Sequence, residues 1–334
     1  MLQGHQTWIF PNQPTLLSTG TVVGPFEGKG PLANDYDIIH GDLWLGQDSY
    51  EKAEQKMLEE AIEIAIRKAG LQKQDIHFFL GGDLLNQIIS SSFAARSLAV
   101  PYLGLFGACS TSMQSLALGA LLVDSKAARY VLCGTASHNP AVEKQFRYPT
   151  EYGAQKPPTA QWTATAAGVA LVGPGGDGPR ITSATIGRVV DMGLQDPFNM
   201  GAAMAPAAVD TLTTHFRDLG ISPSHYDLIA TGDLARVGHQ IARDLLIKHG
   251  LEIPEEIFTD CGILIYGPEQ PVMAGGSGCG CAAAVTFGHI INKMKQGELN
   301  RVLIVATGAL LSPLSYQQKE SIPCIAHAVA MEYY

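Results

Sequence analysis

One cysteine, Cys109, stands where a folded chain can best activate a thiol. The apolar run 102–106 before it is typical of a buried strand, and the uncharged run 113–123 after it is typical of a helix. A helix N-terminus has unpaired N–H groups and the positive end of the helix dipole, and both stabilise negative charge. The segment Gly107-Ala108-Cys109-Ser110-Thr111-Ser112 therefore supports two interpretations: Cys109 is a nucleophile, or the elbow binds an anion.

The sequence around this elbow has a counterpart in the second part of the chain. A helical pattern over 51–69 is followed by a strand that closes on Gly82-Asp83-Leu84. The same order returns over 206–219 and closes on Gly232-Asp233-Leu234. A second elbow, Gly276-Ser277-Gly278-Cys279, then matches the elbow at Cys109. We therefore predict an internal duplication.

The duplication predicts an α/β fold with two pseudo-symmetric βαβαβ halves. The halves are residues 1–178 and 179–334, and the turn-rich stretch 173–179 joins them. Helices that alternate with short apolar strands favour mostly parallel sheets with helices on both faces. Two such units are expected to stack into a layered αβαβα sandwich.

Composition and charge exclude several classes of protein. A chain of 334 residues with 46% hydrophobic and 16% charged residues is expected to be compact and globular. The net charge of −9 argues against binding to nucleic acid or directly to an anionic membrane. The uncharged stretch 97–123 is broken by proline, glycine and serine, so we expect no membrane span. No secretory signal is evident at 1–14, which favours a location of the cytoplasmic type.

The six cysteines form neither a disulfide framework nor a zinc motif. No C-x-x-C pair is present, and Cys279 and Cys281 have no companion pair or adjacent histidines. We expect a reducing compartment and no metal site. Close packing of small residues is the expected role of Cys279 and Cys281.

Four segments carry a resemblance to the thiolase superfamily, in its ketoacyl synthase III branch. They are G-A-C-S-T-S at 107–112, T-A-S-H at 135–138, the run 162–172, and A-T-G-A-L-L-S at 306–312. Within that superfamily the chain resembles the stage V sporulation protein AD family of spore-forming bacteria. The segments that carry this second resemblance are 4–30, F-R-Y-P-T-E-Y-G at 146–153, and Q-W-T at 161–163.

The second resemblance implies a binding protein and not an enzyme. It implies binding of dipicolinic acid, free or as its calcium chelate, for transport into the developing spore, with a link to sporulation and spore germination. The implied partners are the membrane-embedded proteins of the SpoVA set, which would hold the chain at the inner spore (forespore) membrane. A homodimer and no cofactor are also implied.

Two catalytic positions of the ketoacyl synthases differ here. The family places a histidine directly after the strand that matches 227–230, but this sequence continues with Thr231-Gly232-Asp233. The family's asparagine position matches Ser277, whose hydroxyl is shorter than a carboxamide. His239 lies about two helical turns further along and would reach the site only if the intervening segment folds back. We therefore favour a binding pocket, with an acyltransferase that uses Cys109 as nucleophile as the alternative.

A dianionic aromatic ligand requires donors at two places and apolar faces between them. We predict that the backbone N–H groups of 109–111 and those of 277–280 point into one cavity. Side-chain candidates have structural alternatives: His138 as a turn histidine, Arg147 as a surface ion pair, Trp162 or Tyr152 as core, and Asp233 as part of a Gly-Asp turn unless it faces bound calcium. The expected ligand-binding residues are Cys109, Ser110, His138, Arg147, Trp162, Asp233, Ser277 and Gly278.

Overall fold

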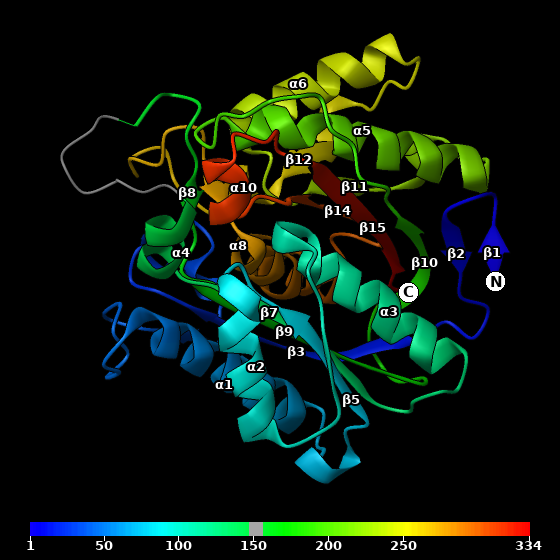
Figure 1. Cartoon of the computed structure of the whole chain (residues 1–334). Coiled ribbons are helices and arrows are strands. Elements are labelled where there is room, and N and C mark those ends of the chain that lie inside the picture. Colours follow the sequence, from blue (N-terminus) through cyan, green and yellow to red (C-terminus); the bar gives the residue numbers. More distant parts are fainter. Residues whose placement is uncertain (147–155) are drawn as a thin grey trace.

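The computed structural model describes residues 1–146 and 156–334, and its two halves repeat one order of strands (Figure 1). The first half has the order β3-β9-β7-β5-β6, and the second has the order β10-β15-β14-β11-β12. The first set comprises β3 (Thr15–Val23), β5 (Phe78–Gly82), β6 (Tyr102–Gly104), β7 (Val131–Ser137) and β9 (Ala166–Gly173). The second comprises β10 (Arg180–Ile186), β11 (Leu228–Thr231), β12 (Phe258–Asp260), β14 (Arg301–Ala309) and β15 (Cys324–Glu332).

Each half is a mixed sheet, which corrects the expectation of mostly parallel strands. In the first half β5 pairs in parallel with β6 and β7, whereas β9 pairs antiparallel with β3 and β7. The second half repeats this pattern, with β11 parallel to β12 and β14, and β15 antiparallel to β10 and β14. The cause is that β9 returns beside β7, and β15 beside β14, without the crossover connection that a parallel pair needs.

Short strands connect and extend the two sheets. A single antiparallel contact between Arg180 of β10 and Thr15 of β3 joins them edge to edge. The small strands are β1 (Leu2–Gln3), β2 (Thr7–Ile9), β4 (Ile38–Ile39), β8 (Trp162–Thr163) and β13 (Gly276–Ser277). β8 and β13 pair in parallel and bring segments of the two halves together beside the second elbow.

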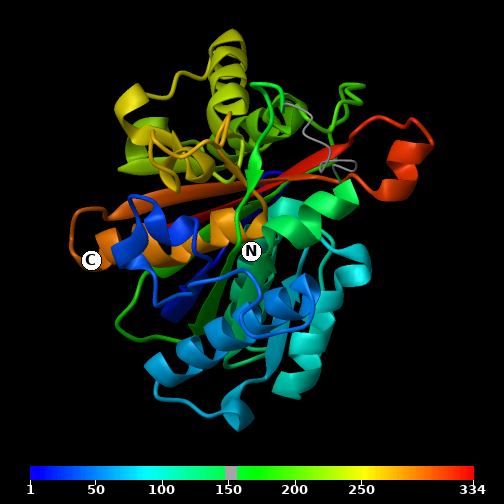
Figure 2. The same cartoon turned by 90° about the vertical axis from the view of Figure 1, so that its left-hand side faces the viewer.

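Helices form three layers around the sheets, as predicted for a layered α/β fold (Figures 1 and 2). α1 (Tyr50–Lys68) and α2 (Ile89–Leu98) cover the outer face of the first sheet, and α5 (Met200–Leu219) and α6 (Ala235–Lys248) cover that of the second. α3 (Thr111–Asp124) and α8 (Cys279–Ala284) lie in the central layer. A π-helical turn (Val285–Ile290) and α9 (Ile291–Lys295) continue α8. The remaining helices are α4 (Asn139–Phe146), α7 (Cys261–Leu264) and α10 (Pro313–Gln317).

The central position of α3 explains why the sequence around it has no charge. α3 contacts β7 and β9 of one sheet and β14 and β15 of the other. Its side chains therefore meet protein on opposite faces, and Met113, Leu116 and Ala120 are fully buried. In the described part of the chain, no helix combines the length and the apolar character needed to cross a membrane.

The ends of the outer helices follow their capping residues and their packing. α1 begins at Tyr50 because the Ser49 side chain accepts from the Lys52 N–H. α5 begins at Met200, six residues before the predicted start at Pro206. Proline favours the first turn of a helix, but the buried side chains of Ala203 and Met204 extend this helix backwards into the core.

Candidate functional site

The chain turns sharply between β6 and α3, and this elbow holds Cys109. Ala108 has a φ of 50°, in the left-handed region that residues with a Cβ seldom adopt. The Ser110 Oγ donates a 2.6 Å hydrogen bond to the Gly107 carbonyl and fixes the turn. Gly308 of β14 lies so close that a Cβ there would be 2.3 Å from the Gly107 oxygen. The second sheet therefore sets the position of the elbow through a contact that only glycine permits.

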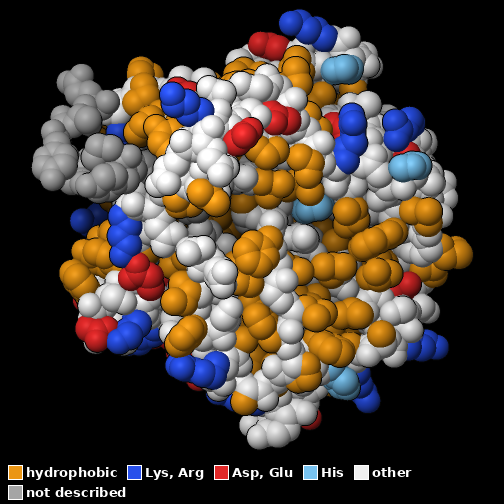
Figure 3. Space-filling model, viewed as in Figure 1, with side chains coloured by type: hydrophobic (Ala, Val, Ile, Leu, Met, Phe, Trp, Pro, Cys, Tyr) orange, Lys and Arg blue, Asp and Glu red, His pale blue; other side chains and the backbone are white. Residues whose placement is uncertain are grey.

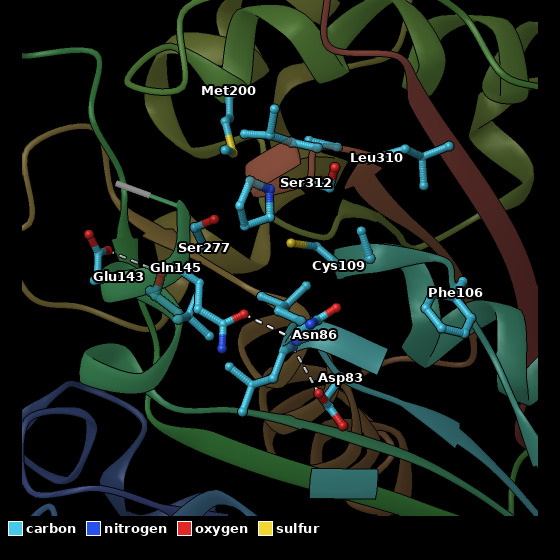
Figure 4. Close-up of a pocket in the computed structure, with 18 of the residues that line it drawn as sticks. Asp83, Asn86, Phe106, Cys109, Glu143, Gln145, Met200, Ser277, Leu310 and Ser312 are labelled. Carbon is cyan, nitrogen blue, oxygen red and sulfur yellow. Dashed lines mark hydrogen bonds between the residues drawn. The ribbon is translucent and has the colours of Figure 1, made fainter. Parts of the chain in front are cut away.

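A cavity of about 410 Å³ lies over Cys109, and residues of both halves line it (Figure 4). Its walls come from the turn after β5, the elbow, α4 and the segment that follows β14. Most lining residues are apolar, and the polar ones are Asp83, Asn86, Gln87, Glu143, Gln145, Thr163, Ser277 and Ser312. An apolar cavity with a few convergent polar groups is typical of a small-molecule site.

The Cys109 thiol contacts the carboxyl group of Asp233, which is fully buried and does not itself line the cavity. Asp233 also accepts from the Thr307 hydroxyl at 2.7 Å, from the Gly278 N–H at 3.0 Å and from the Ser277 hydroxyl at 3.3 Å. Burial raises the pKa of Asp233, and the hydrogen bonds oppose that rise. The turn after β11 therefore presents a carboxyl group to the cysteine.

The Gly278 and Gly280 N–H groups of the second elbow donate to other groups of the protein, which corrects our prediction for these two amides. The Gly278 N–H donates to Asp233, and the Gly280 N–H donates to the Ser137 hydroxyl at 3.1 Å. At the first elbow, the Ser110 and Thr111 N–H groups donate to carbonyls within the turn. The group held at the N-terminus of α8 is thus the protein's own Asp233 carboxyl group.

Two carboxyl groups line the cavity itself. Asp83 accepts from the N–H groups of Leu85 and Ser91, and burial raises its pKa to about 6. Glu143 of α4 accepts from the Thr163 hydroxyl at 3.2 Å and from the Lys156 ammonium at 3.3 Å. Among the described residues, no group of three or more His, Cys, Asp or Glu side chains is arranged to hold a metal ion.

The structure places some of the predicted ligand residues at the cavity and others elsewhere. Cys109 and Ser277 line it, while Asp233 and Gly278 do not line it and contact each other. The Ser110 hydroxyl turns into the elbow and is not among the lining groups. Arg147 and Tyr152 lie outside the described residues.

His138 and Trp162 are not brought to the cavity. The His138 Nε2 donates to the Leu43 carbonyl at 2.8 Å, and burial lowers its pKa to about 4. The Trp162 ring packs against Phe26, with ring centroids 4.9 Å apart. Both side chains therefore match the structural alternatives that the sequence left open.

His239 does not approach Cys109 either. It lies in α6, which is helical from Ala235 and does not fold back. Its ring packs against Phe258 with centroids 4.3 Å apart, and burial lowers its pKa to about 4. Neither His138 nor His239 is thus positioned as a base for the thiol.

Comparisons of structure identify the fold. The 3-oxoacyl-[acyl-carrier-protein] synthase III of Aquifex aeolicus is 16% identical, with a TM-score of 0.61 over 96% of this chain and 100% of that one. Human mitochondrial 3-ketoacyl-CoA thiolase in complex with CoA is 12% identical, with a TM-score of 0.60 over 99% and 100%. These likenesses establish a thiolase-like fold and nothing about activity.

Comparisons of sequence identify the family. A family model described as stage V sporulation protein AD (SpoVAD) matches residues 4–332. The stage V sporulation protein AD of Bacillus subtilis (strain 168) is 49% identical over 331 residues, which are 99% of this chain and 98% of that protein. The chain belongs to the SpoVAD family. The resemblance drawn from the elbow and from the segments at 4–30 and 146–163 is confirmed.

The sequence alone did not identify several cavity residues of this SpoVAD family member. Asn86 and Gln145 both line the cavity and are in contact: the backbone N–H of Asn86 donates to the side-chain Oε1 of Gln145 at 3.1 Å (Figure 4). Met200, Leu310 and Leu311 form part of the apolar wall. For Leu310 and Leu311 the sequence did offer a signal, since they lie in the segment A-T-G-A-L-L-S directly after a buried strand.

Proposed function

We propose that this chain binds dipicolinic acid, free or as its calcium chelate, in the cavity over Cys109 and serves its uptake into the developing spore. The observation that carries the proposal is the contact of the Cys109 thiol with a buried carboxyl group in a cavity open to a small molecule. Membership of a sporulation family agrees with this role. In this proposal the thiolase-like fold serves binding and not acyl transfer.

The lining of the cavity suits a flat aromatic acid. Leucine, valine and methionine side chains offer apolar surface to the faces of a pyridine ring. The carboxamides of Asn86 and Gln145 offer N–H donors of the kind that carboxylates accept. No charged donor is required if the ligand is neutral overall.

The charges around the cavity favour the calcium chelate as the bound form. Asp83 and Glu143 both line the cavity, and an ionised carboxylate repels a free dianion. The chelate has no net charge, and calcium takes six to eight oxygen ligands, more than one dipicolinate supplies. Asp83 or Glu143 would complete its coordination.

The absence of the expected catalytic partners supports a non-enzymatic role. Acyl transfer by a cysteine needs a proton acceptor and donors for the developing oxyanion. Cys109 has the Asp233 carboxyl group as its neighbour, and Ser277 points its hydroxyl at the same carboxyl group. Loss of one oxyanion donor costs about a hundredfold or more in rate.

Calorimetric titration tests the proposal. We expect saturable binding of dipicolinate at one site per chain, stronger when calcium is present. Isophthalate, which has the two carboxylates but lacks the ring nitrogen, serves as the matched control ligand and should bind more weakly. Absence of heat and of any thermal shift with millimolar dipicolinate, with and without calcium, would refute it.

The competing function is an acyltransferase that uses Cys109 as nucleophile. The left-handed Ala108 at the elbow favours it, since a strained turn that exposes a side chain is common at nucleophiles. This function predicts a thioester after incubation with acyl-CoA, visible as a mass increase that Cys109→Ala abolishes. Our proposal predicts no such adduct.

We further propose a homodimer and attachment to membrane-embedded SpoVA proteins at the inner spore membrane. The edge strand β6 pairs only with β5 in the described structure, and it leaves its other edge available. Leu103 and Phe106, at this edge, are 48% and 69% exposed. Figure 3 shows hydrophobic side chains gathered over the middle of the same face as Figure 1. An edge strand with apolar neighbours favours pairing with a second copy.

A further inference from the structure

The contact between Asp233 and Cys109 joins two acidic groups, a carboxyl group and a thiol. Asp233 is fully buried, and Cys109 is 7% exposed at the cavity floor. Two acids in direct contact release their protons in two coupled steps, because the first negative charge opposes the second. Which of the two groups takes the first charge decides whether Cys109 is reactive.

The hydrogen bonds assign the first charge to Asp233. Its Oδ1 accepts from Thr307, and its Oδ2 accepts from Gly278 and Ser277. Donors thus reach both oxygens of the carboxyl group, and hydrogen bonds donated to a carboxylate are stronger than those donated to a neutral carboxyl group, so this arrangement favours the ionised form. The Cys109 thiol is then the remaining donor to this carboxylate.

The other ionisable groups near the pair do not reverse this assignment. Within the described structure, Asp260 and the thiols of Cys261, Cys279, Cys281 and Cys324 interact with Asp233 from the neighbouring elements. Asp83 and Glu143 face Cys109 from the cavity walls, and the cation Lys156 is paired with Glu143. Each of these acids is either neutral or negatively charged, so none of them favours a thiolate at Cys109. The N-terminus of α3 is the opposing influence, since it favours a thiolate.

We propose that Asp233 carries the single negative charge of the pair and thereby keeps Cys109 as a protonated, unreactive thiol. Asp233 is then a positioning residue that suppresses the nucleophile which the elbow would otherwise create. Removal of its charge leaves the helix N-terminus as the dominant influence on the sulfur. This inference concerns the thiol alone and holds whatever ligand the cavity binds.

The test is the pH dependence of Cys109 alkylation by iodoacetamide in the intact protein, followed by mass spectrometry. The other five cysteines are fully buried and remain unlabelled while the protein is folded. Asp233→Asn removes the charge and keeps the hydrogen-bonding contacts to Gly278 and Thr307. Its oxygen can still accept from the Gly278 N–H, and its NH2 group can donate to the Thr307 hydroxyl. We expect its alkylation rate at pH 7.5 to rise about tenfold or more, and its rate profile to shift to lower pH.

Asp48→Asn is the matched control, because it makes the same change at an exposed carboxyl group that pairs with Lys52 and does not line the cavity. Its profile should follow that of the unmodified chain. If Asp233→Asn does not fold, Thr307→Val removes one donor from the carboxylate and should raise the rate by a smaller factor. Equal profiles for the unmodified chain and the folded variant at position 233 or 307 would overturn the proposal.

Discussion

The carboxyl group of Asp233 and the thiol of Cys109 are hydrogen-bonded, although one follows a strand of the second half and the other follows a strand of the first. This contact is possible because the turn that holds Asp233 reaches the second elbow at Gly278, and α8 after that elbow packs against the Cys109 elbow in the central layer. The cavity above the sulfur is therefore built by both halves, whereas the group in contact with the sulfur is an acid. Predictions about binding, stability and assembly follow from this arrangement.

The carboxamides at the cavity are expected to contribute to ligand binding. Asn86→Ala and Gln145→Ala each remove N–H donors from the lining, and each should weaken dipicolinate binding about tenfold, as expected for a hydrogen bond to a charged group. Titration calorimetry measures this loss. Gln55→Ala on α1 removes a carboxamide that does not line this cavity and should leave binding unchanged. Full affinity in both cavity variants would contradict the assignment of the ligand to this site.

The elbow is expected to depend on the glycine at 308. In Gly308→Ala the new Cβ would lie 2.3 Å from the Gly107 backbone oxygen, so β14 or the elbow must shift. We expect a loss of stability of about 1–3 kcal/mol, as for other overpacked interiors, together with weaker ligand binding. Urea unfolding measures the stability. Gly41→Ala, where the added Cβ meets nothing within 4 Å, should change neither property.

Glu27 is expected to make the protein less stable as the pH rises. Burial raises its pKa from 4.5 to about 7, against the opposing hydrogen bonds from Tyr266 and Thr165. The folded protein therefore holds a proton that the unfolded chain releases between pH 4.5 and 7, and stability falls over this interval. The total fall is on the order of 3 kcal/mol and is complete above the folded pKa.

Glu27→Gln removes this titration and keeps an oxygen for Tyr266 and Thr165. The difference in unfolding free energy between the variant and the unmodified chain should therefore grow in favour of the variant from pH 4.5 to 7. Denaturant unfolding at a series of pH values measures it. Glu63→Gln, at an exposed position of α1, should show no such trend. A constant difference across the interval for Glu27→Gln would show that folding does not raise the pKa of Glu27.

The dimer is expected to depend on the β6 edge. Leu103→Asp places a charge at an apolar, half-exposed position and should convert a dimer to a monomer, because an ionised carboxylate is costly to bury in an interface. Light scattering coupled to size exclusion gives the mass. Ile247→Asp, at a 54% exposed position of α6, is the matched control. A monomeric unmodified chain, or a dimeric Leu103→Asp variant, would contradict this interface.

The sequence predicts the architecture of this chain because the duplication is visible in it. The two Gly-Asp-Leu turns and the two elbows do occupy equivalent places in the two sheets, where Asp83 follows β5 and Asp233 follows β11. The direction of the central strands was less predictable. A strand that returns antiparallel beside its neighbour has the same apolar composition as a parallel one.

The candidate site was only partly predictable, for a physical reason. Cys109 and Ser277 were found because an elbow leaves a local signature of small residues. The partners of the amide groups were not found, since the link of Gly278 to Asp233 joins positions 45 residues apart. His138 is polar and follows a strand, yet a carbonyl at Leu43 satisfies it. Such long-range pairing has no local pattern.

The central claim is that a small acid occupies the cavity over Cys109 without reacting there. A crystal structure of the protein soaked with calcium and dipicolinate tests it most directly. We predict density for the ligand between Asn86, Gln145 and Leu310, with the Cys109 sulfur unmodified and its contact to Asp233 retained. Ligand density elsewhere with this cavity empty, or density continuous with the sulfur, would contradict the account.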